Sequence, residues 1–181
     1  MTAFPGNPFW DFSLAVYGRP GVSEACLRLQ DRHGLDVNLL LVCCWAGAQG
    51  RGLDSAGIAR LAAAVADWHH AVVQPLRGVR RWLKTQAVAP EDLAGALRAT
   101  IKAKELEAER IEQQLLYDAL GGPAADTASR GGEDALAAKN LRLYLEVSGL
   151  EPDAVDTAAL AALLQGAFPS LTEDAAQSLL A

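Results

Sequence analysis

PFWDFSLAVYGRPGVSEACLRLQDRHGLDVNLLLVCCWAG, residues 8–47, carries the start and stop signals of three helices. The first helix is predicted over 8–17, because Asn7 is a good N-cap and Pro8 suits the first helical position, where a missing N–H costs nothing. The second is predicted over 22–33, because a glycine follows its last residue and favours the left-handed end of a helix. The two helices and their turns form one compact unit with the segment that follows.

The third helix, predicted over 37–46 with Asp36 as its N-cap, is apolar on nearly every face, and Asn38 is its polar exception. A helix that is apolar all round is surrounded by other helices. Periodicity and cap signals predict further helices at about 55–73, 76–86, 91–120, 133–147, 153–165 and 171–180. A capping box from Ser170 to Glu173 is expected to open the last of these. The sequence therefore predicts an all-α helical bundle of about eight or nine helices around a buried central helix, 37–46.

Composition divides the chain into parts. Residues 1–85 carry nine Lys and Arg against six Asp and Glu, together with all four Trp, whereas residues 86–181 carry seven against sixteen. Gly, Ala, Ser, Thr and Asp dominate 121–132, which predicts a flexible linker. We therefore expect a helical core domain at 1–120 and a C-terminal helical extension at 133–181, packed on the core or on a partner.

Net charge, the length of apolar runs and the use of cysteine argue against several classes of protein. The net charge of −6 argues against general nucleic-acid binding, which usually needs a basic surface. The longest strongly apolar run, Leu39–Ala46, is far shorter than the roughly 20 residues of a membrane span. The three cysteines, Cys26, Cys43 and Cys44, are a poor disulfide framework, since their number is odd and two are adjacent. With no secretory signal pattern, a soluble cytoplasmic protein is expected.

Four cations share one predicted helix face: Arg77, Arg80, Arg81 and Lys84 follow the spacing i, i+3, i+4, i+7. Like charges at this spacing repel, so something negative is expected opposite them. The protein's own carboxylates, an anionic ligand or nucleic acid, and an acidic partner protein all satisfy this requirement. Because four cations alone give weak and salt-sensitive binding to nucleic acid, that ligand is the least expected.

The sequence contains no convincing metal, cofactor or catalytic set. His69 and His70 are adjacent, so they do not face one point on a helix, and no Cys or His follows at the spacing that completes a metal pair. Glu105, Glu109 and Glu112 lie on one side of the long predicted helix, and a solvated face with ion pairs is the expected arrangement. We therefore predict no catalytic residues, no metal and no cofactor.

Several stretches of the first 120 residues resemble the uncharacterised proteobacterial family DUF2390. The matching stretches are Asn7–Leu14, Pro20–Val22, Ala25–Leu27, Leu29–Asp31, Asp36–Leu41, Trp45–Gly47, Val72–Arg77 and Arg80–Lys84, with Ile101–Lys102, Glu105 and Glu109–Arg110 of the long helix. The resemblance implies a bacterial, cytoplasmic helical protein. It implies no activity, cofactor or catalytic residue, and it does not extend beyond residue 121.

Two functions fit these observations. The leading hypothesis is a protein-interaction or adaptor module, which binds a protein partner or a second copy of itself through helix faces. The alternative is an enzyme or small-ligand carrier with an aromatic-lined pocket whose arginines bind an anionic group. The pocket is expected among Trp10, Tyr17, Trp45, Trp68 and His69, and the predicted binding residues are Trp10, Asp11, Asn38, Trp68, His69, Arg77, Arg80, Arg81 and Lys84.

Overall fold

The computed structural model describes residues 6–85, 90–122 and 132–181, and every regular element among them is a helix. The helices are α1 (Pro8–Tyr17), α2 (Val22–His33), α3 (Val37–Ala48), α4 (Ser55–Trp68), the π-helical turn η1 (His69–Val73), α5 (Gln74–Thr85), α6 (Glu91–Leu120), α7 (Glu133–Val147), α8 (Ala154–Ala167) and α9 (Glu173–Leu180). The predicted all-α class is confirmed. The predicted linker at 121–132 falls largely on 123–131, which lie outside the described residues.

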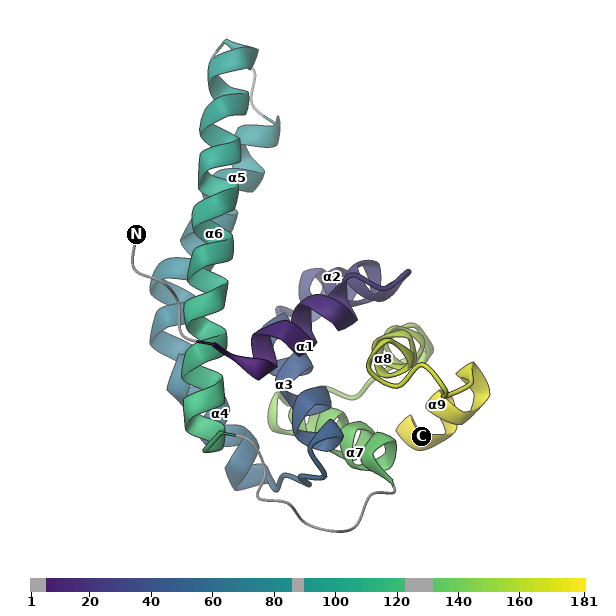
Figure 1. Cartoon of the computed structure of the whole chain (residues 1–181). Coiled ribbons are helices and arrows are strands. Elements are labelled where there is room, and N and C mark those ends of the chain that lie inside the picture. The colour runs from purple at the N-terminus through teal and green to yellow at the C-terminus, as the bar shows by residue number, and fades with distance from the viewer. Residues whose placement is uncertain (1–5, 86–89, 123–131) are drawn as a thin grey trace.

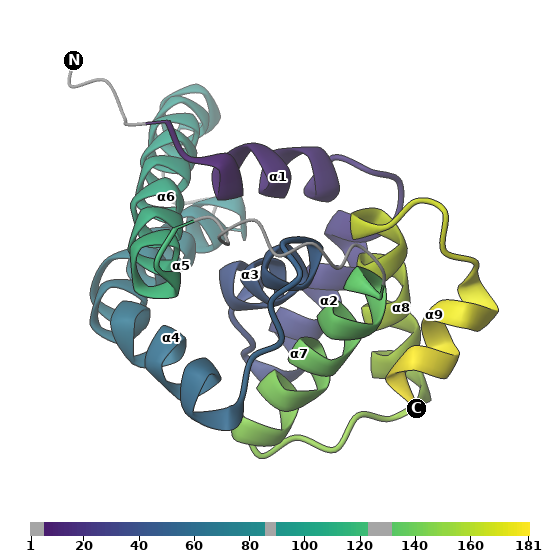
Figure 2. The same cartoon turned by 60° about the horizontal axis from the view of Figure 1, so that its bottom comes forward.

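Helix α3 is the centre of the bundle, as its apolar sequence predicts. Its residues from Asn38 to Gly47 are all buried, and Figure 2 shows α3 encircled by α1, α2, α4 and α7. The closest neighbour is α7, since a Cβ added at Gly47 would lie 2.5 Å from the Ala137 Cα. Only a glycine lets two helix backbones approach so closely.

Aromatic side chains of α1 pack against Trp45 of the central helix α3. The Trp45 ring lies edge-on to three other rings at centroid separations of 6.1 to 6.3 Å, those of Phe9, Phe12 and Tyr117. Edge-to-face pairs at such separations add to the stabilisation that burial provides. Trp45 is thus a core residue, 2% exposed, and it is not among the residues that line the cavity described below, where it was expected.

A π-helical turn joins α4 to α5 without a break in the path. The sequence predicts that one helix ends at Val73 and that Pro75 opens another, whereas α5 already begins at Gln74. A proline inside a helix lacks an N–H and crowds the carbonyl four residues earlier, here Ala71. That carbonyl lies inside η1, where the wider turn accommodates the proline.

Helix α5 and residues 91–104 of α6 extend away from the other helices as a two-helix arm (Figure 1). Within the described residues, α5 buries no side chain and the first buried side chain of α6 is Glu105. At 1.5 Å per residue, the 30 residues of α6 span about 45 Å. The base of the arm, where α6 passes the body, is where polar side chains become buried.

Helices α7 and α8 pack on the first helices of the chain, and α9 packs on α7 and α8. Helix α8 lies against α2, where Arg32 donates a 2.5 Å hydrogen bond to Asp156 and His33 lies 2.9 Å from the same carboxylate. The predicted capping box at Ser170 is wrong, because Thr172 is the N-cap of α9. A capping box opens α8 instead, between Asp153 and Asp156. No helix among the described residues is long and apolar enough to cross a membrane.

Candidate functional site

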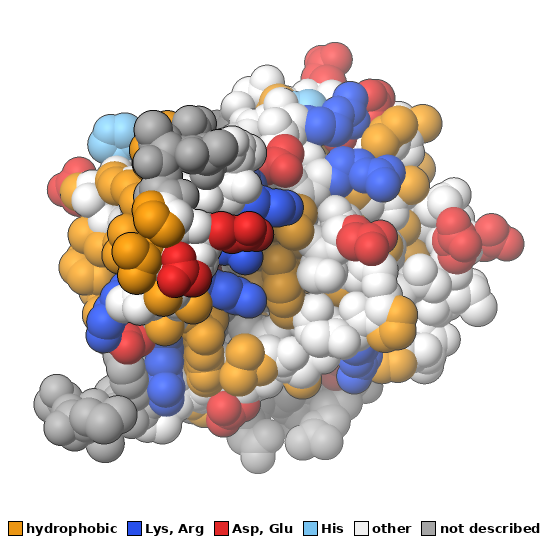
Figure 3. All heavy atoms as spheres, turned by 90° about the horizontal axis from the view of Figure 1, so that it is seen from above, with side chains coloured by type: hydrophobic (Ala, Val, Ile, Leu, Met, Phe, Trp, Pro, Cys, Tyr) orange, Lys and Arg blue, Asp and Glu red, His pale blue; other side chains and the backbone are white. Residues whose placement is uncertain are grey.

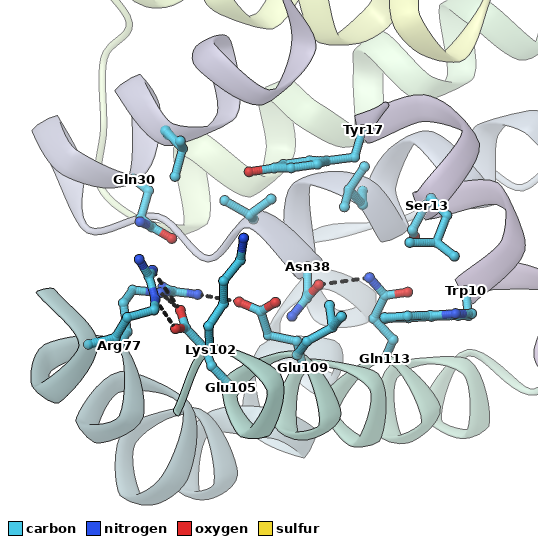
Figure 4. Close-up of a pocket in the computed structure, with 16 residues that line it drawn as sticks. Trp10, Ser13, Tyr17, Gln30, Asn38, Arg77, Lys102, Glu105, Glu109 and Gln113 are labelled. Atoms are coloured by element: carbon cyan, nitrogen blue, oxygen red, sulfur yellow. Dashed lines mark hydrogen bonds and ion pairs between the residues drawn. The ribbon is translucent and has the colours of Figure 1, made fainter. Parts of the chain in front are cut away.

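A cavity of about 440 Å³ lies where α1, α2 and α3 face the base of the arm (Figure 4). That volume falls within the range of small-molecule sites in proteins. Its apolar lining consists of side chains from four helices: Leu14, Tyr17, Leu27, Val37, Leu41 and Leu106. Trp10 also lines it, with the Arg110 guanidinium 5.4 Å from its ring centroid. These side chains form a surface suited to an apolar or aromatic body.

Two buried polar atoms in the wall of this cavity have no hydrogen-bond partner among the described residues. They are the Ser13 hydroxyl oxygen and Gln113 Oε1, and each residue is 3% exposed. Buried polar groups are nearly always hydrogen-bonded, and each one left unsatisfied costs free energy. Both side chains lie beside Trp10 at one end of the view in Figure 4. Each oxygen has almost no accessible surface, so a bound molecule would reach it only after the side chain rotates.

Charged side chains occupy the arm side of the cavity. Arg77 Nε donates to Glu105 Oε1 at 3.1 Å and Arg77 Nη2 donates to Glu109 Oε1 at 2.7 Å. Arg80 also donates to Glu105, through both Nε and Nη2. Lys102 points into the cavity in Figure 4, and its ammonium has no ion pair within the described part of the chain. With three cations and two carboxylates, the lining has a surplus positive charge.

The two carboxyl groups respond differently to this environment. Burial alone would raise the pKa of Glu105, but the hydrogen bonds and charges of Arg80 and Arg77 hold it below its usual range. Burial raises the pKa of Glu109 above its ordinary value, because its contact with Arg77 only partly offsets the desolvation. Glu105 is therefore the firmly ionised partner of the arginines.

A second hollow of about 380 Å³ continues along the arm between α5 and α6. Its charged lining is wholly basic: Arg80, Lys84, Arg98 and Lys102. Arg80 and Lys102 line both this hollow and the cavity, so the two spaces adjoin. Figure 3 looks down onto the arm and shows Lys and Arg side chains beside a hydrophobic hollow. The site therefore grades from an apolar cavity to a cationic rim.

Behind the floor of the cavity, three side chains converge in the interior. His69 Nδ1 lies 2.7 Å from Glu112 Oε1 and 3.3 Å from Asp36 Oδ2. Asn38 connects this group to the cavity, because its Nδ2 donates to Glu112 Oε2 at 2.7 Å while its Oδ1 accepts from Gln113 Nε2 at 2.8 Å. One ligand atom from each of Asp36, His69 and Glu112 lies within 4.8 Å of the others, a grouping that could hold a metal ion.

Burial and the nearby charge of Glu112 raise the pKa of Asp36 to about 7. Burial alone would lower the pKa of His69, but its hydrogen bond to Glu112 and the charge of Asp36 raise it above the ordinary value. His69 also lines a separate hollow of about 360 Å³ with Arg77 and Arg81, which opens the group toward the surface. The protonation of Asp36 and that of His69 therefore depend on each other.

The structure places the predicted binding residues in several settings. Trp10, Asn38, Arg77 and Arg80 line the cavity, and Lys84 lines the adjoining basic hollow. His69 lies in the buried group behind it. The remaining predicted residues lie outside the cavity lining, and each has a different environment: Asp11 is exposed, Trp68 donates to the Ala108 carbonyl at 3.0 Å, and Arg81 pairs with Asp31 at 2.7 Å.

Sequence reasoning missed several residues of this site. The expected solvated face of α6 is wrong for Glu105 and Glu112, which are 5% and 0% exposed, because α5 and α3 cover them. Asp36 is the N-cap of α3, as predicted, and its second oxygen also faces His69. The clearest signal was that the number of cations at 77–84 equals the number of acidic residues at 105–112. Nothing in the local pattern distinguished Lys102.

The comparison with known proteins bears on this site. A family model described as "protein of unknown function (DUF2390)" matches residues 8–116. No curated protein and no solved structure matches the chain. All the residues lining the cavity, together with Asp36, His69 and Glu112, lie within the matched stretch, whereas α7, α8 and α9 lie beyond it. Because the match covers more than half of the chain, the protein belongs to the DUF2390 family.

Proposed function

We propose that this protein binds a small amphipathic organic anion in the cavity between α1–α3 and the arm. The observation that carries the proposal is the cavity lining, which combines an apolar wall, two unpartnered buried polar atoms and an unpaired lysine. The apolar body of the ligand would lie against Trp10, Tyr17 and Leu106. A polar group of the ligand would bond to Ser13 and Gln113 once their side chains rotate toward the cavity, because both oxygens are now buried.

The acidic group of the ligand belongs at the cationic rim. Arg77 and Arg80 already bind Glu105 and Glu109, so the free charge there is that of Lys102 with Lys84 and Arg98 beside it. A carboxylate, sulfonate or phosphate at Lys102 gains a charge-assisted contact that a neutral analogue cannot make. A cytoplasmic location is part of this proposal, and the free thiols of Cys26, Cys43 and Cys44 are compatible with it.

A matched pair of fluorescent probes tests the proposal. 8-Anilinonaphthalene-1-sulfonate and N-phenyl-1-naphthylamine share one aromatic body, and only the first carries an anion. The full chain should bind the sulfonate with 1:1 stoichiometry and more tightly than the neutral amine. Lys102→Glu should weaken sulfonate binding about tenfold, which corresponds to about 1.4 kcal/mol, and should change binding of the amine less than about twofold.

Two further variants complete the test. Lys104→Glu is the control, because Lys104 lies on the same helix but pairs with Glu107 at the surface. It should leave both affinities unchanged, whereas Trp10→Ala should weaken both probes, since it removes part of the shared apolar wall. Equal affinities of the wild type for the two probes, or sulfonate binding that Lys102→Glu leaves intact, would overturn the proposal. Circular dichroism should confirm that each variant keeps its helix content.

A protein-interaction role is the second candidate function, and the arm is the observation that favours it. Large apolar side chains on both helices of the arm are between 47% and 65% exposed: Val79, Trp82, Leu93 and Leu97. Clustered exposed apolar residues often mark contact surfaces. The variant Trp82→Ser/Leu97→Ser should reduce the self-association of the protein in sedimentation velocity. If the wild type is monomeric at all concentrations, self-association through the arm is ruled out.

A further inference from the structure

The buried group behind the cavity contains more acidic side chains than basic ones. Two carboxylates, Asp36 and Glu112, face one imidazole, that of His69. The single Nδ1–H of a histidine can serve one acceptor, and Glu112 Oε1 is the nearer at 2.7 Å. Asp36 Oδ2 is buried and has no hydrogen-bond donor among the described residues, although it lies 3.3 Å from the same nitrogen.

The other atoms of these side chains are held in place by neighbours. Asp36 Oδ1 accepts from the Asn38 backbone N–H at 2.8 Å, and the Asp36 N–H donates to the Tyr144 hydroxyl at 3.0 Å. Glu112 Oε2 accepts from Asn38 Nδ2 at 2.7 Å. Each carboxylate therefore has one oxygen fixed by the protein and one directed at His69 Nδ1. Such outer hydrogen bonds orient the ligands in metal sites.

We propose that Asp36 Oδ2, His69 Nδ1 and Glu112 Oε1 bind a divalent first-row transition metal ion of the Mn²⁺ to Zn²⁺ series. Mixed imidazole and carboxylate ligands suit these ions. At metal–ligand distances of about 2.1 Å, neighbouring ligand atoms lie about 3.0–3.4 Å apart. The 3.3 Å from His69 Nδ1 to Asp36 Oδ2 falls in that range, and the 2.7 Å to Glu112 Oε1 must lengthen by about 0.3 Å when the ion replaces the hydrogen bond. The ion replaces the Nδ1 proton, which leaves to solvent or moves to Nε2.

The site is accessible from outside without unfolding of the bundle. His69 retains 13% exposure of its side chain and lines the hollow of about 360 Å³, with Gln74 and Arg77 among its neighbours. Glu112 is fully buried behind it. The metal therefore enters past His69, and solvent molecules from that hollow complete its coordination. This inference is independent of the ligand proposed for the cavity.

Titration of the chelator-treated full chain with Co²⁺ and Zn²⁺ tests the site. Calorimetry should show one saturable ion per chain and melting should shift to higher temperature, while bound Co²⁺ should give visible absorption bands of a nitrogen and oxygen site. Asp36→Asn, His69→Gln and Glu112→Gln, all close in shape to the original residues, should each weaken binding at least tenfold. His70→Gln is the matched control, because His70 is exposed and its ring lies 3.2 Å from Gln74 Oε1, away from the proposed site. This variant should bind the ion as the wild type does.

A second measurement needs no variant, so it holds even if a substitution prevents folding. In the wild-type protein, Mn²⁺ should broaden the nuclear magnetic resonance signals of Asp36, His69 and Glu112, with their neighbours Asn38 and Gln113, before those of other residues. Absence of saturable binding, binding that Asp36→Asn and Glu112→Gln leave unchanged, or broadening centred elsewhere would overturn the inference. Loss of binding in His70→Gln would place the ion at another site and overturn it as well.

Discussion

Asn38 Nδ2 donates a hydrogen bond of 2.7 Å to Glu112 Oε2, and the two residues are 74 positions apart in the chain. The same side chain accepts from Gln113 Nε2, so one amide of the central helix satisfies two neighbouring residues of α6. Asn38 is thereby both part of the cavity lining and the support of the buried carboxylate behind it. Its polarity in an otherwise apolar helix has a structural cause.

Replacing the Asn38 side chain should lower the free energy of unfolding by more than the loss of a small polar side chain usually does. In Asn38→Ala, Glu112 Oε2 loses its donor and Gln113 Nε2 loses its acceptor, and both are buried. Leaving such groups unsatisfied should lower the free energy of unfolding by about 2–4 kcal/mol. Urea unfolding followed by circular dichroism measures this change. Gln177→Ala, which removes an exposed amide, should stay within about 0.5 kcal/mol, and a similarly small loss in Asn38→Ala would contradict the prediction.

Two glutamates of α6 that are two residues apart should differ in their contribution to stability. Glu105 is buried between Arg77 and Arg80, whereas Glu107 is exposed and pairs with Lys104. Glu105→Ala leaves the partly buried Arg80 without its carboxylate and Arg77 with Glu109 alone, so it should lower the free energy of unfolding by about 2–4 kcal/mol. Glu107→Ala should cost less than about 0.5 kcal/mol, as exposed pairs do. Similar losses in the two variants would show that the arm does not depend on this pairing.

Two helix glycines should respond in opposite directions to alanine. In Gly47→Ala the new methyl group meets the Ala137 backbone, which cannot yield without moving α7 away from α3, so a loss of about 1–3 kcal/mol is expected. Gly95 lies in α6 with open space around it, and Gly95→Ala should gain about 0.5–1 kcal/mol from the better helix former. Thermal melting of the two variants beside the wild type is sufficient to compare them.

Stability should fall as the pH rises toward neutrality in metal-free protein. The pKa of Asp36 is raised to about 7 by burial and by Glu112, against about 4 in an unfolded chain. Between these values the native state binds more protons than the unfolded state, so the free energy of unfolding decreases with rising pH. The raised pKa of His69 acts in the same direction, since a histidine that binds its proton more tightly when folded loses that stabilisation as the pH increases.

Urea titrations at pH 5 and pH 7.5 with a chelator present measure this slope. The wild type should lose about 2–4 kcal/mol across that interval, and Asp36→Asn should lose markedly less, because asparagine keeps the helix cap but does not titrate. Asp54→Asn changes the exposed N-cap of α4 and should retain the slope of the wild type. An equal slope in Asp36→Asn would show that Asp36 does not control it.

Local signals explain why the helices could be predicted. Asn7, Asp36 and Asp54 each accept a hydrogen bond from a backbone N–H at the start of a helix, and Gly34 ends α2 in the left-handed conformation. These interactions involve residues within four positions of one another, so the sequence displays them directly. The apolar surface of α3 likewise predicted its central place.

The site was harder to predict, because it depends on contacts between distant segments. A charge pattern on α6 is the same whether the carboxylates face water or another helix, and only the packing of α5 and α3 buries Glu105 and Glu112. Adjacent histidines do not face one point on a helix, so nothing in the sequence predicted a metal site at His69. The side chains that approach His69 come from the N-cap of α3 and from α6, not from its own helix. Burial of polar groups is decided by tertiary structure.

The π-helical turn makes the arm sensitive to chain length. One residue fewer within His69–Val73 would restore an ordinary α-helix and rotate everything after it by about 100° about the helix axis. Arg77 would then turn away from Glu105, although every side chain needed for the pairing would still be present. In this stretch an insertion or deletion changes the direction in which every later side chain of the helix points, whereas a substitution leaves that direction unchanged. Homologues should therefore keep the number of residues constant here, while the exposed positions His70 and Ala71 are free to vary in residue type.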